Sequence, residues 1–289
     1  MVATIAVTVA LYMIKISVLT PTCRDQFTEV QVKALKQQSF KDFEWVLVND
    51  LYERTKDKIT SLINDAFRVT HIAPSIRESY PVIASACNDG LIHAKGELVF
   101  FMNDYVIPHP DCLARHWGIY QKYPDAMISG RGLQVGFKPE EIETKIGNEV
   151  VVDYRTSLFD NNFFKRERIE PDLYEAFRDG IQNWWAGRND SAPLEAILNC
   201  NGFDETFDGR WGGQDADLAQ RLMTYGLRFL LDMKSICLEF EHIHGIKKAI
   251  RTEKEQQAFQ ETIINRKVRE GIYTSGISRD LKEARQLKL

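Results

Sequence analysis

The chain has little cysteine, and none of it is arranged as a zinc or redox site. Five cysteines, Cys23, Cys87, Cys112, Cys200 and Cys237, are scattered over 289 residues and form no C-x-x-C pair. Dispersed thiols of odd number fit a reducing compartment. We therefore expect a cytoplasmic protein.

The chain also lacks an excess of positive charge. Lysine and arginine total 37 against 41 aspartate and glutamate, and the formal net charge is −4. No global basic field therefore attracts the protein to nucleic acid or to an anionic membrane. We expect neither bulk nucleic-acid binding nor membrane contact. A hydrophobic content of 44% is ample for a packed core.

Long hydrophobic runs are missing too. The apolar stretch at the N-terminus is shorter than the roughly 20 residues that a membrane-spanning helix needs. It also lacks the basic start and small-residue cleavage site of a signal peptide. Because the residues from Met13 onward already read as a strand and a loop, one hypothesis is a start at Met13, with residues 1–12 an upstream extension.

Apolar runs alternate with helical periods along the first half of the chain. We predict strands over 14–20, 44–48, 69–72 and 98–102, and helices over 27–38, 53–67 and 80–94. This alternation predicts an α/β fold with a mostly parallel central sheet, helices on both faces, and ligands at the carboxyl ends of the strands.

The second half is less regular. Residues 131–180 are expected to form irregular strands and short helices along one edge of the sheet, before a helix over 218–225 and a strand over 228–232. Residues 13–245 are then expected to form one domain. The polar tail, 246–289, is expected to be a helical appendage packed on the outside.

Polar residues gather where three of the predicted strands end. The segments are S-V-L-T-P-T-C-R up to Arg24, V-L-V-N-D up to Asp50, and a strand that leads into Asn103 and Asp104 before a proline-containing loop. A carboxylate at the end of a buried strand can bind a divalent cation, which neutralises a diphosphate leaving group. The alternative is that these side chains only cap loops and helices.

These segments resemble the family 2 glycosyltransferases and the related galactosyltransferase-like catalytic domains. Those families carry a P-T-x-x-R-like loop, an acidic pair, an A-R-N-x-G element and G-E-x-x-x-F-L-D-x-D; this chain has P-T-C-R, N-D, A-C-N-D-G and G-E-L-V-F-F-M-N-D-Y. The resemblance implies a GT-A fold and a nucleotide-sugar donor. The donor-binding residues that it implies are Pro21, Thr22, Arg24, Asp50, Asn88, Asn103 and Asp104.

A second element, N-G-F-D-E-T-F-D-G-R-W-G-G-Q-D-A-D-L-A-Q-R-L over 201–222, resembles the G-F-D-E-x-F-x-G-W-G-G-E-D-x-D-L-x-x-R-L element of those enzymes. Gly212 and Gly213 would let the backbone approach a sugar closely, and Trp211 offers a flat face to a pyranose ring. Asp215 would be the general base of an inverting displacement. Asp217 is expected to have a structural role in the first helical turn.

The segment E-F-E-H-I-H-G contains two candidate metal ligands. The resemblance implies that a histidine here closes the metal site, and we favour His244 over His242. Two aromatic residues, Trp184 and Trp185, are either core residues or acceptor-binding residues, and the sequence leaves both alternatives open.

The chain departs from the family pattern at the metal-binding motif. Its D-x-D becomes Asn103, Asp104 and Tyr105, so the third-position carboxylate is lost, whereas the change of E-D to Gln214 and Asp215 retains the base. A divalent cation, Mn²⁺ or Mg²⁺, is the expected cofactor, and its need is in question because one carboxylate remains.

We expect an inverting glycosyltransferase that uses a nucleotide diphosphate sugar, with UDP as the nucleotide because Asp50 suits the imide edge of uracil. The acceptor stays open among a glycan, a lipid, a protein, a metabolite and a modified base. One alternative is a GT-A-like domain that binds nucleotide sugars or glycans without catalysis. A nucleotidyltransferase is the other, although it would carry a glycine-rich basic loop where this chain has P-T-C-R-D-Q-F.

Overall fold

The computed structural model describes residues 14–76, 82–136, 165–177, 185–209, 212–240, 263–264, 266–276 and 279–288. The hypothesis on Met13 and residues 1–12 therefore lies outside the described residues. No helix among those described is long and apolar enough to cross a bilayer.

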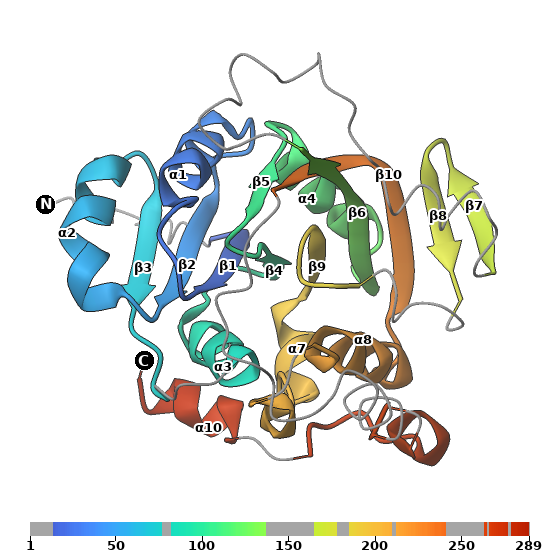
Figure 1. The fold of residues 1–289 in the computed structure, drawn as a ribbon. Helices are drawn as coiled ribbons and strands as arrows, with labels where there is room; N and C mark the ends of the chain where they lie inside the picture. The colour runs from blue at the N-terminus through green and yellow to red at the C-terminus, as the bar shows by residue number, and fades with distance from the viewer. Residues whose placement is uncertain are drawn as a thin grey trace, which may run out of the picture.

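The first half forms the predicted β-α alternation (Figure 1). The elements in chain order are β1 (Ile16–Thr22), α1 (Thr28–Gln37), β2 (Phe43–Asn49), α2 (Tyr52–Ile63), β3 (Arg68–Ile72), α3 (Ile83–His93), β4 (Leu98–Phe101), β5 (Val106–Pro108) and α4 (Cys112–Lys122). All four predicted strands and all three predicted helices are present, with ends that differ by a few residues. The helix α4 was not predicted.

The second half completes the sheet. It contains β6 (Ala126–Val135), β7 (Arg166–Glu170), β8 (Leu173–Ala176), β9 (Asp190–Pro193), α7 (Leu194–Asn199), the 3-10 helix η3 (Glu205–Phe207), α8 (Gln214–Tyr225), β10 (Arg228–Phe240) and α10 (Leu281–Gln286). The predicted helix over 218–225 and strand over 228–232 are confirmed as parts of the longer α8 and β10.

The strands form one ten-stranded sheet in the order β3-β2-β1-β4-β9-β6-β10-β8-β7, with β5 paired to β10. The strands β3, β2, β1 and β4 are parallel, and β6 and β10 are parallel to each other. Between these two groups β9 runs antiparallel to both β4 and β6. The carboxyl ends of β1, β4 and β6 therefore face the same edge of the sheet, which is where ligands bind in open α/β sheets.

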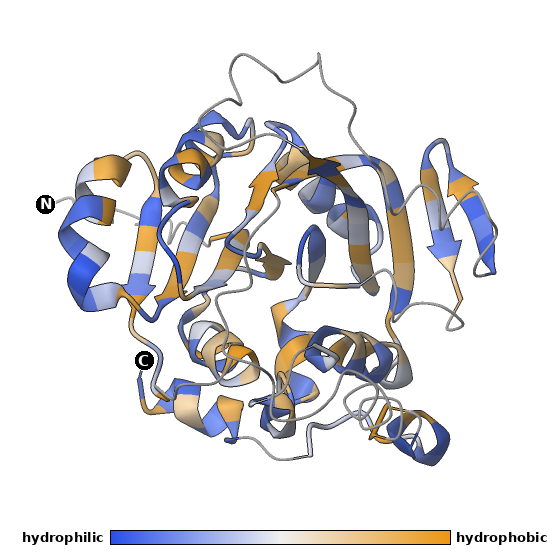
Figure 2. Ribbon diagram, viewed as in Figure 1, coloured by the Kyte–Doolittle hydropathy of each residue, from blue (hydrophilic) through white to orange (hydrophobic). Residues whose placement is uncertain are grey.

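Helices cover both faces of the sheet, as predicted. The helices α1, α2 and α4 share one apolar core with one face of β1, β2 and β4. The helices α3, α7, α8 and α10 share the main core with the opposite face. Figure 2 shows the resulting pattern, with hydrophobic residues concentrated on the inner strands and hydrophilic residues on the outer sides of the helices. Because successive side chains of a strand point to opposite faces of the sheet, the mainly apolar inner strands contribute to both cores.

One expectation about the second half needs correction. The strand β6, Ala126–Val135, lies inside the sheet, whereas residues 131–180 were expected to form irregular structure along one edge. The hairpin of β7 and β8 does lie at the edge, as expected. In the described part of the tail, α10 packs against α3, and its Leu281 is completely buried in the main core.

Candidate active site

The ends of β1 and β4 bring three of the predicted donor-binding residues together. The two strands pair in parallel. The Thr22 hydroxyl donates a hydrogen bond to Asp104 Oδ2 at 2.7 Å, and Arg24 Nε lies 2.9 Å from the same oxygen. Burial raises the pKa of Asp104, while Arg24 and Thr22 act in the opposite direction. A short turn after β1 thus holds the guanidinium group of Arg24 against the Asp104 carboxylate that follows β4. Pro21 comes immediately before Thr22 in the chain.

Asp50 lies beside this group. It follows β2, which pairs with β1, and its backbone N–H donates to the carbonyl oxygen of Thr22 at 3.0 Å. Its side chain is exposed. The sheet therefore places a solvent-facing carboxylate next to the donor-binding residues that the resemblance implied.

A loop over residues 185–189 lies between Asn103, after β4, and Asp215, at the start of α8. The Asp190 carboxylate organises this loop, since Oδ2 accepts hydrogen bonds from the backbone N–H groups of Ala186 and Arg188 at 3.0 and 3.1 Å. The hydroxyl of Ser129 on β6 donates to the other oxygen. The backbone N–H of Asn103 donates to the Gly187 carbonyl at 3.1 Å. The loop is therefore fixed to β6 and to the residues after β4.

The helix α8 presents Asp215 to this loop. Gly212 and Gly213 precede the helix with φ values of +75° and +93°, a backbone conformation that glycine adopts without strain. A β-carbon on Gly187 would lie 3.0 Å from Asp215 Oδ1 and 3.5 Å from Asn103 Oδ1. Gln214 Nε2 donates to the other oxygen of Asp215 at 3.0 Å. The prediction that Asp215 opens a helix is confirmed.

The surroundings of Asp215 favour its neutral form. Burial, and to a smaller extent the negative charge of Asp190, raise its pKa to about 7 against the opposing effect of the positive charge of Arg188. Arg188 is itself held by an ion pair with Glu239 of β10. A carboxyl group whose pKa lies near neutrality can take up and release a proton under physiological conditions, which is the property of a general base.

Two family models match this chain. The model of glycosyl transferase family 2 covers residues 17–191, which is more than half of the 289 residues, and the model described as the N-terminal domain of galactosyltransferase covers 189–248. The chain belongs to glycosyl transferase family 2. The two matched regions meet at β9, directly after the loop that faces Asp215.

Individual relatives agree with the family. Validoxylamine A glucosyltransferase of Streptomyces hygroscopicus subsp. limoneus is 26% identical over 250 residues, which are 78% of this chain and 52% of that protein. The chain thus spans about half the length of the curated relatives it matches.

Solved structures share the fold. The S. aureus TarS fragment 1–349 in complex with UDP-GlcNAc has a TM-score of 0.66 at 13% identity, over 91% of this chain and 68% of that one. The mannosyltransferase PcManGT of Pyrobaculum calidifontis, in complex with GDP-Man and Mn²⁺, has a TM-score of 0.55 at 14% identity, over 95% of this chain and 68% of that one. The predicted GT-A architecture is confirmed.

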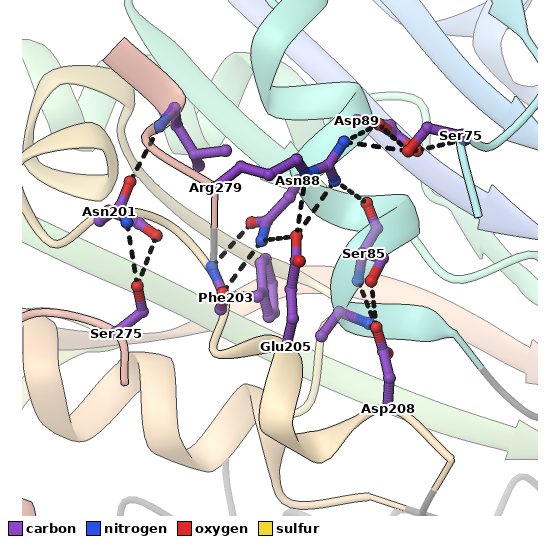
Figure 3. A network of polar contacts seen from close by, with 12 residues as sticks. Ser75, Ser85, Asn88, Asp89, Asn201, Phe203, Glu205, Asp208, Ser275 and Arg279 are labelled. Atoms are coloured by element: carbon purple, nitrogen blue, oxygen red, sulfur yellow. Dashed lines mark hydrogen bonds and ion pairs between the residues drawn. The ribbon is translucent and has the colours of Figure 1, made fainter. Parts of the chain in front are cut away.

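The structure corrects the expected role of Asn88. This residue of α3 is completely buried, and all of its amide groups serve the scaffold (Figure 3). Nδ2 donates to the Phe203 carbonyl and to Glu205 Oε1, at 3.0 and 2.9 Å, and Oδ1 accepts from the Phe203 N–H at 2.8 Å. Asn88 therefore fixes α3 to the segment before α8, and the expectation of a donor contact was wrong.

The aromatic candidates divide into a core residue and residues that the structure does not describe. Trp185 has 1% of its surface exposed and packs against Phe101 and Phe229, so the core alternative holds and the acceptor-binding alternative is wrong. The other aromatic and metal-ligand candidates lie outside the described residues: Trp184, Trp211, His242 and His244.

The described residues alone do not make a metal site. They contain no group of three or more His, Cys, Asp or Glu side chains that could hold a metal ion. Asp104 is the carboxylate of the altered motif, and its Oδ2 already interacts with Thr22 and Arg24. Oxygen ligands from elsewhere would have to complete a coordination shell around a hard cation.

Sequence reasoning missed the loop residues that touch the site. Gly187, Arg188 and Asp190 lie in the segment W-A-G-R-N-D, in which only the tryptophans were predicted as candidates. Glycine and aspartate three positions apart in a polar stretch are a signal for a tight turn held by a carboxylate. That signal could have located the turn, but nothing local indicated that it faces Asp215.

Proposed function

We propose that this chain transfers a sugar from a nucleotide diphosphate donor to an acceptor hydroxyl, with inversion at the anomeric carbon and with Asp215 as the general base. The observation that carries the proposal is the position of Asp215 at the start of α8, against the loop that is hydrogen-bonded to Asn103. Its pKa of about 7 suits proton uptake from a hydroxyl.

The reaction is a single displacement. The acceptor oxygen forms a bond to the anomeric carbon as its proton passes to the Asp215 carboxylate, and the bond from that carbon to the donor phosphate oxygen breaks. Nucleoside diphosphate leaves with the bonding electron pair. The positive charge of Arg24, held beside Asp104, would stabilise the negative charge that develops on the leaving group.

UDP is the nucleotide that we propose for the donor. The exposed Asp50 carboxylate would accept a hydrogen bond from the imide edge of uracil, and Pro21, Thr22 and Arg24 would line the base and ribose. TarS, which shares the fold, forms a complex with UDP-GlcNAc. The name of the relative makes UDP-glucose the first donor to test and validoxylamine A the first acceptor.

We also propose that a divalent cation, Mn²⁺ or Mg²⁺, binds together with the donor. Asp104 would supply one carboxylate oxygen, His244 or His242 would supply a nitrogen, and phosphate oxygens of the donor would complete the shell. The cation would neutralise charge on the diphosphate. PcManGT, of the same fold, is a complex with GDP-Man and Mn²⁺.

The test is a donor screen that measures release of nucleoside diphosphate, with acceptors added in turn, on the wild type and on Asp215→Asn. Acceptor-dependent UDP release by the wild type and its loss in the variant support the proposal. Tight UDP-sugar binding without release with any acceptor would instead indicate a non-catalytic binding domain. Release of pyrophosphate from a nucleoside triphosphate would indicate a nucleotidyltransferase.

A further inference from the structure

The C-terminal residues are built into the domain. Arg285 of α10 donates from Nη1 to the carbonyl oxygens of Leu91 and Ala94, at 2.5 and 2.7 Å, where α3 ends. Figure 1 shows α10 beside α3. A basic side chain at this position satisfies carbonyl groups that the helix leaves without partners.

A second contact ties the same segment to η3 (Figure 3). Arg279 forms ion pairs with Asp89 of α3 at 2.7 Å and with Glu205 of η3 at 3.0 Å. Glu205 also accepts the hydrogen bond from Asn88. The C-terminal segment thus reaches the stretch of chain that leads to α8.

The third contact reaches α8 itself. Lys267 has 2% of its surface exposed, and its ammonium group lies 2.5 Å from Asp204 Oδ2 and 2.7 Å from Asp217 Oδ1. Asp204 precedes η3, and its carboxylate also accepts hydrogen bonds from the Thr206 and Gly276 backbone N–H groups. The buried Lys267 therefore joins Asp204 and Asp217, the two ends of the segment that contains Asp215.

The charges of this cluster are balanced. Arg221, one helical turn after Asp217, donates from Nε to that carboxylate at 2.8 Å. Its two Nη atoms donate to the carbonyl oxygens of Cys200 and Gly202. Two carboxylates thus face two cations in a buried site. Removing one member of such a set leaves an uncompensated buried charge, which is costly.

The geometry separates this cluster from the reacting groups. Asp215 and Asp217 are two positions apart, and side chains at that spacing point to different sides of a helix. Asp217 faces Lys267, while Asp215 faces Gly187. The lysine therefore supports the first turn of α8 from behind the site.

We propose that Lys267 is a positioning residue for the transfer reaction: it holds the first turn of α8 so that Asp215 stays against the Gly187 loop. This inference rests on the proposed role of Asp215 as base. Lys267 lies beyond both matched regions, 17–191 and 189–248, so the support comes from a part of the chain that neither family model covers.

The experiment measures kcat, KM for the donor and the Kd of UDP in Lys267→Met. We expect kcat to fall by about 10- to 100-fold, because small displacements of a catalytic group cost up to about 100-fold in rate. We expect KM and Kd to stay within about twofold of wild type, because Thr22, Arg24 and Asp50 belong to other elements. The double variant Asp204→Asn/Lys267→Met removes one negative and one positive charge, so the cluster stays neutral. We therefore expect it to fold while it lacks the same contact between Lys267 and Asp217.

Arg285→Met is the matched control, because it removes another C-terminal tie that contacts α3 and leaves α8 alone. It should lower Tm without a selective loss of kcat. A folded Lys267→Met or double variant with kcat within about twofold of wild type overturns the inference. That result, combined with an inactive Asp215→Asn, would leave the proposed function intact, whereas an active Asp215→Asn would remove the base assignment itself.

Discussion

Gly187 and Asp215 lie close together in the structure although they are far apart in the sequence. A β-carbon at position 187 would lie 3.0 Å from Asp215 Oδ1, and the backbone of Gly187 has φ +64°. Both the close approach and the left-handed conformation favour glycine here. The position of the proposed base therefore depends on the absence of a side chain in the opposing loop.

Gly187→Ala should reduce transfer. The added methyl group forces the Asp215 carboxylate to move by a few tenths of an ångström, and the left-handed backbone costs about 1 to 2 kcal/mol with alanine. We expect kcat to fall by about tenfold or more while UDP affinity is retained. Steady-state kinetics and UDP calorimetry measure the two effects.

Gly226→Ala is the control for backbone strain, because Gly226 also has a positive φ and a β-carbon there meets nothing within 4 Å. It should lower Tm and leave kcat near the wild-type value. Equal losses of kcat in the two variants would show that strain alone explains the effect at Gly187.

Asp215→Asn should abolish transfer and preserve donor binding, since the amide keeps the shape of the carboxylate and loses its basicity. General base catalysis contributes typically about 10²- to 10⁴-fold. The measurement is acceptor-dependent UDP release, with UDP affinity as the check on the fold of the site. Activity within about tenfold of wild type would contradict the assignment.

Turnover should rise with pH through about 7, because the base must be deprotonated and burial raises the pKa of Asp215 to about 7. The same shift affects stability. The pKa in the folded state is above the unfolded value, so the contribution of the neutral carboxyl to stability is full below pH about 4 and is lost as pH rises through about 7. Asp215→Asn should therefore have the higher Tm at pH about 8 and lose this advantage under acidic conditions.

Asp50→Ala should weaken UDP binding and reduce the preference for UDP over GDP. Hydrogen bonds to charged groups contribute about 1.5 to 3 kcal/mol, and we expect the lower end because the Asp50 side chain is exposed. Calorimetry with UDP and GDP gives both quantities. An unchanged UDP affinity would show that a group other than Asp50 recognises the uracil base.

Mn²⁺ should bind weakly to the free protein and clearly when UDP is present, because Asp104 offers few oxygens without the diphosphate. Asp104→Ala should remove the UDP-dependent binding. Mn²⁺ titrated into UDP without protein corrects for the affinity of the nucleotide alone. Full transfer activity in excess chelator would exclude a role for the cation and leave Arg24 as the group that stabilises the leaving diphosphate.

Local patterns predicted the parallel half of the sheet. The strands β1, β2 and β4 are buried and mainly apolar, and the polar residues that follow them, up to Arg24, Asp50 and Asp104, marked the edge where the candidate site lies. Buried parallel strands have this composition because both of their faces are covered.

The strand β9 could not be predicted in the same way. Its four residues, D-S-A-P, are buried between β4 and β6, yet they contain no β-branched or aromatic residue and end in proline. Their pairing depends on backbone hydrogen bonds to two strands that are distant in the sequence. Strand propensity is weak for such residues, so no local pattern marks this strand.

The sequence by itself determined the family, the alternation of strands and helices, and the place of Asp215 at the start of a helix, because periodicity and motifs are local properties. The tertiary structure alone decided that Gly187 faces Asp215, that Asn88 and Trp185 belong to the scaffold, and that Lys267 lies buried under α8. A lysine is usually read as a surface residue, and burial becomes favourable only when its partners meet it. Those partners, Asp204 and Asp217, come from 63 and 50 residues away, a distance over which composition and spacing carry no information.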